Sequence, residues 1–266
     1  EEQWGLDKPF LVRYVNFVVN ACKGDRGTSY ATNQDVFDSV ITRMPATLKL
    51  AAFSMLLALV VSVPLGILAA LKHNSIWDSL ATALATVGVS LPKFWFGLVL
   101  MIVFSLRLGW LPSTGSAELS EGLGTFLSYI IMPAASLALG MAATQTRMIR
   151  SSMLDVLNQD YVRYARSKGL RERVVIWSHA LKNAMIPVIT VIGGEVGGLL
   201  GGAVVTESIF SWPGVGRLMM NSISKRDYPM IQGITLMLCI SYLLVNLLID
   251  IVYAWVDPRI RLDKKS

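Results

Sequence analysis

The chain has 266 residues, of which 53% are hydrophobic and only 16% are charged, and its formal net charge is +6. A soluble domain of this length needs more charge to cover its surface, and the apolar residues stand in blocks of about 20 or more, the length that crosses about 30 Å of hydrocarbon. These features exclude an ordinary soluble protein and indicate a membrane protein. The excess of Lys and Arg is typical of the cytoplasmic loops of membrane proteins, so it gives no reason to expect nucleic acid as a partner.

Five apolar blocks predict five membrane spans and therefore an all-α, polytopic transmembrane helical bundle. Pro64 and Pro92 fall inside two of these blocks and predict kinks, because neighbouring helices can satisfy the backbone groups that a proline frees. Residues 1–44 precede the first block, and their opening EEQWGLDKP is neither a signal peptide nor a spanning segment. The spans are expected at residues 45–71, 80–106, 129–148, 184–205 and 230–256, which together make a transmembrane domain over residues 45–256.

The distribution of basic residues assigns the two sides of the membrane. Residues 149–183, between the third and fourth spans, hold the longest basic stretch, and the positive-inside rule places this loop in the cytoplasm. Five spans then place residues 1–44 outside and the basic tail, residues 257–266, inside. Residues 206–229 are too short and too polar to cross the membrane, so they are expected to form an external loop.

The cytoplasmic loop predicts a short amphipathic helix, a break at Gly169 and a second helix that ends at Pro187. Val162 and Ala165 share one face of the first helix and have arginines around them. Such a helix can lie on anionic lipid, or it can present a knob that fits a groove on a soluble partner. The residues alone favour neither interpretation.

Glu195 lies near the middle of the fourth span, where an ionisable side chain is costly and normally faces a cavity or a partner. It either lines a path through the membrane, which favours a cationic cargo, or pairs with a buried Lys or Arg. Asn246 in the last span is a weaker candidate for the path. Small-xxx-small spacings in the fourth span predict close helix packing or a smooth wall along a pore, and they involve Gly193, Gly194, Gly197, Gly198, Gly201 and Gly202.

The stretch DYVRYARSKGLRERVVIWSHALKNAMIPVIT resembles the coupling loop of inner-membrane permeases of ATP-binding-cassette importers, and most of all their dipeptide, oligopeptide and nickel branch. Three further parts of the chain resemble the same branch: GLDKP with KGDRGTSY, TESIFSWPGVGRLMMNSISKRDYPMIQG, and LVNLLIDIVYAWVDPRIR. The likeness therefore covers nearly the whole chain. It also implies a sixth span upstream of GLDKP.

In this family the short helix of the coupling loop fits into the ATPase subunit. The resemblance therefore implies that coupling depends on Arg163, Tyr164, Ala165, Lys168, Gly169 and Leu170. Two of these positions depart from the family: Arg163 stands where the general importer pattern has an acid, and Tyr164 where the branch usually has a small residue.

Residues 206–229 resemble a re-entrant loop that faces the external binding protein in this family. The resemblance implies an external gate or a docking surface made by Trp212, Pro213, Gly214, Gly216 and Asp227. The alternative is an interfacial turn anchored by Trp212, because aromatic rings favour the boundary between lipid and water.

The expected function is that of a permease subunit of an ATP-driven importer in the bacterial cytoplasmic (inner) membrane. Its implied partners are a second, homologous permease, two ATPase subunits and an external substrate-binding protein. The sequence has no GxxxxGK[ST] motif, so ATP and Mg²⁺ are expected on the partner subunits, and no cofactor or metal site is expected in this chain. Small peptides are the expected cargo, and nickel or a metal–chelator complex is the alternative.

Two other classes of protein fit the sequence less well than an importer subunit. A secondary transporter or channel would need no ATPase, but the long basic cytoplasmic loop and the small number of candidate proton-relay residues argue against it. A membrane-anchored enzyme would need a nucleophile with a base or a metal site, and the sequence shows no such constellation.

Overall fold

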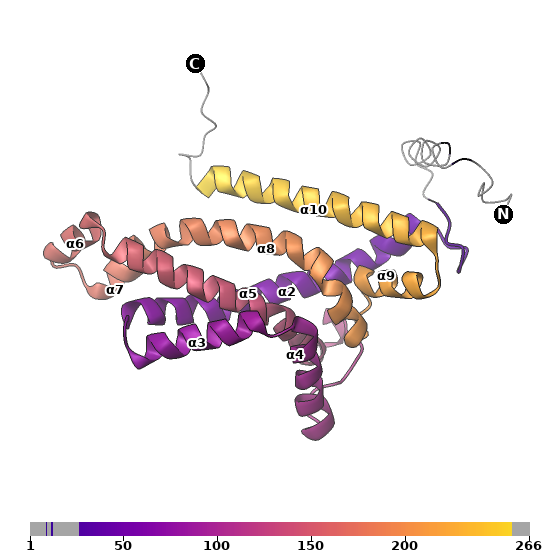
Figure 1. The fold of residues 1–266 in the computed structure, drawn as a ribbon, viewed down its shortest axis with the longest axis horizontal. Coiled ribbons are helices and arrows are strands. Elements are labelled where there is room, and N and C mark those ends of the chain that lie inside the picture. The colour runs from indigo at the N-terminus through magenta and orange to yellow at the C-terminus, as the bar shows by residue number, and fades with distance from the viewer. Residues whose placement is uncertain (1–8, 10–11, 13–26, 257–266) are drawn as a thin grey trace, which may run out of the picture.

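The computed structural model describes residues 9, 12 and 27–256, without the side chains of residues 200, 250 and 252–256. Most of residues 1–26 of the expected external segment, and all of the expected tail 257–266, therefore lie outside the described residues. The regular elements are α2 (Val36–Leu71), α3 (Ile76–Ser90), α4 (Lys93–Leu100), the π-helix η2 (Met101–Arg107), the 3-10 turn η3 (Leu119–Glu121), α5 (Leu123–Leu157), α6 (Asp160–Ser167), α7 (Glu172–Val174), the π-helix η4 (Val175–Ala180), α8 (Leu181–Ile209), α9 (Val215–Ser224) and α10 (Tyr228–Val256) (Figure 1).

The helix α2 begins at Val36, well before the boundary expected at residue 45. Asp35 is its N-cap, and the Asp35 side chain accepts a hydrogen bond from the Asp38 N–H at 3.0 Å. This cap satisfies one of the free N–H groups at the helix start. The helix therefore begins at the Asp35 cap and not at Pro45, where the first span was expected. At 36 residues α2 is about 54 Å long, which is more than the hydrocarbon thickness.

The centre of the bundle is α5, which packs along α2 and also contacts α3 and α8. The main apolar core includes Leu50 of α2, Ile130 and Leu137 of α5, Leu199 of α8, and Trp212, which follows α8. In its most apolar stretch α5 is 61% buried, whereas α10 is only 6% buried. The exposed leucines of α10 therefore face lipid or another protein, because the few contacts that α10 makes with the rest of the bundle leave them uncovered.

The second expected span, residues 80–106, is not one continuous helix. It consists of α3 and the run of α4 and η2, which are bent by 103° at the break between Ser90 and Lys93. Pro92 disfavours helical geometry at Leu91, whose backbone is extended, and the Pro92 ring then fixes the start of α4. Among the described residues, four helices are long and apolar enough to cross a membrane, and this bent pair supplies a fifth if it counts as one span. In Figure 1, α4 points away from the long bundle.

The expectation that a helix ends at Pro187 is wrong. The helix α8 runs through Pro187 without a break and continues to Ile209. Proline is tolerated inside this helix because other helices pack around it, and the six-residue π-helix η4 directly precedes it. The helix α5 also extends to Leu157, so the connection between the two helices is shorter than the expected loop 149–183.

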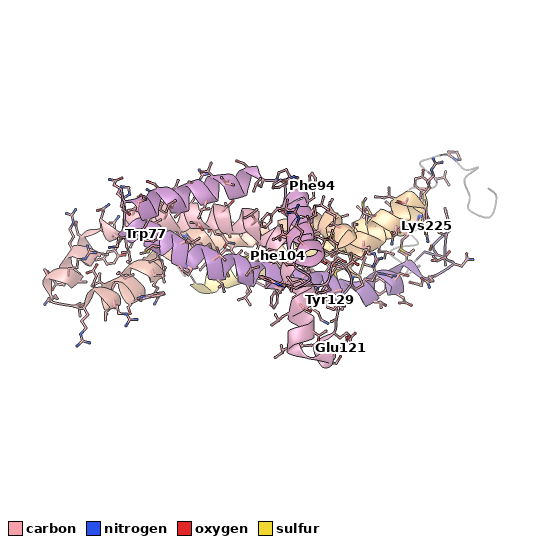
Figure 2. All side chains as sticks on the ribbon, turned by 90° about the horizontal axis from the view of Figure 1, so that it is seen from below. Trp77, Phe94, Phe104, Glu121, Tyr129 and Lys225 are labelled. Carbon is pink, nitrogen blue, oxygen red and sulfur yellow. The ribbon has the colours of Figure 1, made fainter. Side chains whose placement is uncertain are left out.

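The two expected functional ends lie far apart along the molecule. In Figure 1, α6 and α7 are at one end of the long axis, whereas α9 and the start of α2 are at the other. In Figure 2, Trp77 lies near the first end and Lys225 near the second, with Phe94 of α4 between them. This separation is what a membrane-crossing bundle with one cytoplasmic and one external end requires.

Candidate functional site

The expected coupling segment consists of α6 and the turn at Gly169, which together form a short, separate knob. Val162 is fully buried and Ala165 nearly so, and both pack against Val175 of η4. The same small cluster includes Val156 and Leu157 at the end of α5. The apolar face of α6 therefore turns inward, and its orientation is fixed by the end of α5 and the start of the next helix.

Gly169 ends α6 in a left-handed conformation, with φ +78°. The Gly169 N–H donates to the Arg166 carbonyl at 2.9 Å, and the Leu170 N–H donates to the Ala165 carbonyl at 3.4 Å. These two bonds make a Schellman motif, which satisfies carbonyls at a helix end and favours glycine. A Cβ at Gly169 would meet no atom within 4 Å, so the need for glycine in the described chain is conformational rather than steric.

The outer surface of the knob carries the other expected coupling residues. Arg163 and Lys168 are exposed, and Tyr164 is 63% and Leu170 42% exposed. The Lys168 ammonium lies 5.2 Å from the centre of the Tyr164 ring, a cation–π distance. The knob thus presents an aromatic ring and aliphatic groups among positive charges.

An ion pair joins the two segments that flank the Gly169 turn of the knob. Arg166 and Glu172 form a salt bridge of 2.7 Å across the Gly169 turn. The hydrogen bond to Glu172 raises the pKa of the Arg166 guanidinium. Both side chains are partly exposed, so the pair stabilises the turn only modestly.

At the opposite end, the carboxylate of Glu207 lies fully buried where α2, α8 and α9 meet. It accepts hydrogen bonds from the Thr47 hydroxyl at 2.7 Å and from the Arg217 N–H at 3.1 Å, and the Gly216 N–H donates to it as well. The charge faces the start of the ten-residue helix α9, whose dipole favours an anion there. Glu207 is not among the residues predicted from the sequence, although an acid next to the end of an apolar helix is a signal that could have identified it.

Gly214 and Gly216 make room for this carboxylate and for α8. A Cβ on Gly214 would lie 2.2 Å from an oxygen of Glu207, and a Cβ on Gly216 would lie 2.5 Å from the backbone Cα of Val204. Neither position can hold a side chain without displacing buried groups. These two glycines, expected at a gate or docking surface, are buried and hold helices together in this structure.

Trp212 is a core residue and not an interfacial anchor. It is 2% exposed, and its indole N–H donates to the Ala46 carbonyl at 2.9 Å. Asp227 is similarly buried, accepting from the Ser29 hydroxyl and from the Tyr30 N–H at 3.1 Å. Of the five residues expected at the gate, Pro213 alone is exposed.

Glu195 lies beside a hollow of about 340 Å³ that opens between α3, α4, α5 and α8. Its carboxylate accepts a 2.7 Å hydrogen bond from the amide of Gln145, which in turn accepts one from the Ser62 hydroxyl at 2.9 Å. Lys93 at the start of α4 lines the same hollow and attracts Glu195 electrostatically. The structure therefore joins elements of both interpretations of Glu195: it lines a hollow, and a lysine lies nearby.

Asn246 does not join Glu195 at this hollow. Its side-chain oxygen would be 3.4 Å from a Cβ on Gly197, and the Tyr242 ring would be 2.4 Å from the same atom. Gly197 follows Glu195 by two positions, which is a rotation of about 200° around the axis of an α-helix. Gly197 therefore lies on the face of α8 opposite Glu195. Asn246 and Tyr242 therefore mark the packing of α10 on α8.

The glycines of α8 divide between the two roles that the sequence left open. Gly197 gives close approach to α10, as small-residue spacings predict. Gly194, Gly198 and Gly201 would meet nothing within 4 Å if they carried a Cβ, so their side of the helix is bare in the described chain.

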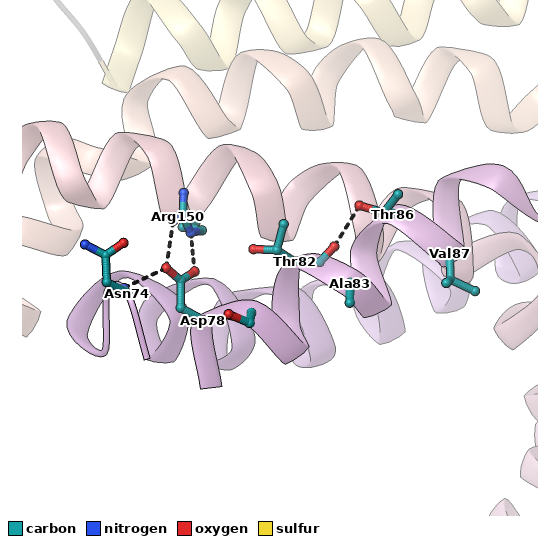
Figure 3. Close-up of a pocket in the computed structure, with 8 residues that line it drawn as sticks. Asn74, Asp78, Thr82, Ala83, Thr86, Val87 and Arg150 are labelled. Carbon is teal, nitrogen blue, oxygen red and sulfur yellow. Dashed lines mark hydrogen bonds and ion pairs between the residues drawn. The ribbon is translucent and has the colours of Figure 1, made fainter. Parts of the chain in front are cut away.

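A second polar hollow, of about 580 Å³, lies between α3 and α5 (Figure 3). Asp78, near the start of α3, is buried and accepts hydrogen bonds from Arg150 of α5 at 2.5 and 2.8 Å. His73 and the Asn74 N–H also contact Asp78, at 3.1 and 3.0 Å. This cluster fixes the start of α3 on α5. No role for Asp78 is predicted from the sequence, because its partner Arg150 lies 72 positions away.

The geometry is that of a helical membrane subunit with three features. The α6 knob lies at one end, the buried Glu207 joins α2, α8 and α9 at the other, and the hollow lined by Glu195 and Lys93 lies between them. Residues 62–262, most of the chain, match the family described as the binding-protein-dependent transport system inner membrane component. The chain belongs to this family of inner-membrane permeases. The expected fold class, family and membrane location are confirmed.

Curated relatives match almost all of the chain. It is 41% identical to the dipeptide transport system permease protein DppB of Alkalihalophilus pseudofirmus, over 98% of this chain and 84% of the relative. It is 43% identical to the oligopeptide transport system permease protein AppB of Bacillus subtilis, over 97% and 83%. It is 40% identical to the glutathione transport system permease protein GsiC of Salmonella typhimurium, over 98% and 82%.

Solved structures show the same fold at low sequence identity. A chain of the MetNI methionine ABC transporter, in an inward-facing conformation, superposes with a TM-score of 0.67 at 15% identity, over 82% of this chain and 96% of that one. A chain of an amino acid ABC transporter gives a TM-score of 0.56 at 16% identity, over 84% and 95%. At this identity the likeness concerns the fold alone.

Proposed function

We propose that this chain forms one half of the path by which short peptides, delivered by an external binding protein, enter the cell. The observation that carries the proposal is its identity of 40% or more, over nearly its full length, to permeases named for dipeptides, oligopeptides and glutathione. These cargoes share one chemistry, because each is a short peptide with charged ends.

ATP hydrolysis by two separate subunits drives the cycle in this proposal, and those subunits hold ATP and Mg²⁺. The knob around α6 is the docking element, since its inner face is fixed by Val162 and Ala165 while Tyr164, Lys168 and Leu170 point outward. A rigid knob can transmit the movement of an ATPase to α5 and α8, between which it lies in the chain. Alternating access requires such a two-state movement of packed helices.

A second, homologous permease completes the path. The bare side of α8 at Gly194, Gly198 and Gly201, and the unburied apolar surface of α10, suit contact with a further membrane subunit or with lipid. The end that carries α9 would meet the binding protein. Because Trp212, Gly214, Gly216 and Asp227 are buried, they would act by holding this end in shape, with Pro213 and its exposed neighbours as the contact surface.

The alternative cargo, nickel or a metal–chelator complex, receives no specific support. The described residues contain no group of three or more His, Cys, Asp or Glu side chains that could hold a metal ion. The three relatives reported above are named for peptides. Membership of a binding-protein-dependent family also favours an importer over a secondary transporter or channel.

Transport by the assembled importer in lipid vesicles tests the proposal. The permease pair and its ATPases are reconstituted with ATP inside and the binding protein outside, and uptake of a radiolabelled dipeptide is compared with uptake of ⁶³Ni²⁺. We expect dipeptide uptake that requires both ATP and the binding protein. Uptake of nickel in place of the dipeptide, or dipeptide uptake that does not depend on ATP, would contradict the proposal.

A further inference from the structure

The carboxylate of Glu195 is held in a fixed position by a buried relay across three helices. The Ser62 hydroxyl of α2 donates to the side-chain oxygen of Gln145, and the Gln145 amide donates to one oxygen of Glu195. Gln145 is fully buried, so its orientation is fixed by these two bonds. In the described part of the chain no side chain closes an ion pair on Glu195, and Glu195 is one of the residues that line the hollow.

The opposite charge, Lys93, is placed in the same hollow on a flexible stem. Two glycines lie beside that stem: a Cβ on Gly140 would be in ordinary contact with the Lys93 Cε at 3.7 Å, and one on Gly202 with the Nζ at 3.8 Å. Among the described residues the Lys93 ammonium forms no ion pair. Lys93 also directly follows the 103° break before α4, so its backbone is positioned by that bend.

A pair of opposite charges in a membrane span normally closes into a salt bridge, because each charge alone is costly to desolvate. Glu195 and Lys93 instead line a shared hollow whose volume of about 340 Å³ lies in the usual range of small-molecule sites, about 300–1,000 Å³. A ligand that carries one charge of each sign satisfies both side chains at once. A bare metal cation would meet repulsion from Lys93.

We propose that Glu195 and Lys93 form a cargo site for zwitterionic short peptides inside the membrane. Glu195 accepts the N-terminal ammonium of the peptide, and Lys93 pairs with its C-terminal carboxylate. The peptide side chains extend toward Gly198 and the bare side of α8, where a Cβ on Gly198 would meet no atom of the described residues within 4 Å. This inference rests on the proposed peptide transport and names the groups of the cargo that the path recognises.

Three peptides test the assignment of each charge: Ala-Phe, its C-terminal amide and its N-acetyl derivative. Uptake by the full importer in vesicles is measured for wild type, Lys93→Gln and Glu195→Gln, with each peptide supplied at concentrations that saturate the same binding protein. The concentration of the peptide-loaded binding protein is then varied, and the ratio of kcat/KM for this loaded protein between variant and wild type reports on the permease. Lys93→Gln should lower this value about tenfold for Ala-Phe, and for the acetyl derivative, but leave the amide unchanged. Glu195→Gln should lower it about tenfold for Ala-Phe and the amide but leave the acetyl derivative unchanged.

Two controls separate recognition from structural damage. Lys93→Arg keeps the charge and should retain the wild-type pattern, and Lys49→Gln removes an exposed lysine of α2 that lines neither hollow, so it should affect all three peptides equally. Equal losses for all peptides in Lys93→Gln and Glu195→Gln would overturn the proposal in favour of a structural pair, and no loss would overturn it outright. If wild type shows ATP-driven peptide uptake, either of these two results refutes the cargo site alone. If wild type shows no ATP-driven peptide uptake, the proposed function is refuted.

Discussion

The hydroxyl of Thr47 donates a 2.7 Å hydrogen bond to the carboxylate of Glu207, although 160 positions separate the two residues. The same hydroxyl accepts the Val215 N–H at 2.9 Å, and the carboxylate accepts the Arg217 N–H at 3.1 Å. Two side chains thus satisfy the free N–H groups at the start of α9 and tie them to α2. This arrangement places a carboxyl group in an apolar environment, where backbone N–H groups at the start of α9 and the Thr47 hydroxyl are its hydrogen-bond donors.

Replacing Glu207 by Ala should destabilise the permease substantially. The Thr47 hydroxyl and the Arg217 N–H would lose their buried acceptor, and each unsatisfied group costs about 1–3 kcal/mol. We expect the free energy of unfolding to fall by at least about 2 kcal/mol, with a lower Tm in thermal unfolding of the detergent-solubilised importer. Glu207→Gln keeps one acceptor oxygen and should lose less.

The matched control for this change is Asp155→Asn, because Asp155 is exposed on α5. Its Tm should equal that of wild type. A Glu207→Ala protein as stable as this control would show that the buried carboxylate does not join α9 to α2.

Alanine at Gly214 or Gly216 should prevent the packing of α9 against α8. The new Cβ would lie 2.2 Å from the Glu207 carboxylate in the first case and 2.5 Å from the Val204 backbone in the second. Backbone cannot give way as a flexible side chain can, so Gly216→Ala should have the larger effect. The yield of folded importer by size-exclusion chromatography measures this. Gly124→Ala, where a Cβ meets nothing within 4 Å, should leave the yield unchanged, and a normal yield for Gly216→Ala would contradict the geometry.

The sequence predicted the membrane fold, the break at Gly169 and the special position of Glu195, because each depends on local composition. An apolar block needs about 20 residues to cross, a glycine ends a helix, and a charge among apolar residues stands out. The stop expected at Pro187 was wrong for the opposite reason. A local rule for proline fails where packing of neighbouring helices stabilises a continuous α8.

The partners of the buried charges could not be predicted in the same way. Lys93 and Glu195 line one hollow but stand 102 positions apart, and the relay through Gln145 and Ser62 involves two further helices. Such contacts depend on how α2, α4, α5 and α8 pack, which hydrophobic periodicity alone does not specify. The residues expected at an external gate illustrate the same limit, because Trp212 and Asp227 were selected by their sequence context while their burial follows from the packing.

Substitutions at Gly169 should separate backbone conformation from partner fit in the knob. With φ at +78°, alanine costs about 1–2 kcal/mol, whereas asparagine tolerates this region better. If conformation decides, binding-protein-stimulated ATP hydrolysis should fall in the order Gly, Asn, Ala, Val. If close packing against an ATPase decides, alanine should exceed asparagine because it is smaller. The rate of stimulated hydrolysis in lipid vesicles gives the order, and full activity of Gly169→Val would refute both explanations.

The ion pair between Asp78 and Arg150 should show strong coupling in a double-mutant cycle. Asp78 is buried with a side-chain exposure of 7%, and Arg150, at 26%, is its main partner. Arg150→Met leaves the carboxylate buried without its guanidinium and should lower stability by about 2–3 kcal/mol, less than for a fully buried pair because solvent reaches Arg150. Asp78→Asn combined with Arg150→Met removes both charges and should recover part of this loss, seen as a higher Tm than for Arg150→Met alone. Additive effects of the two changes would show that the pair does not fix α3 on α5.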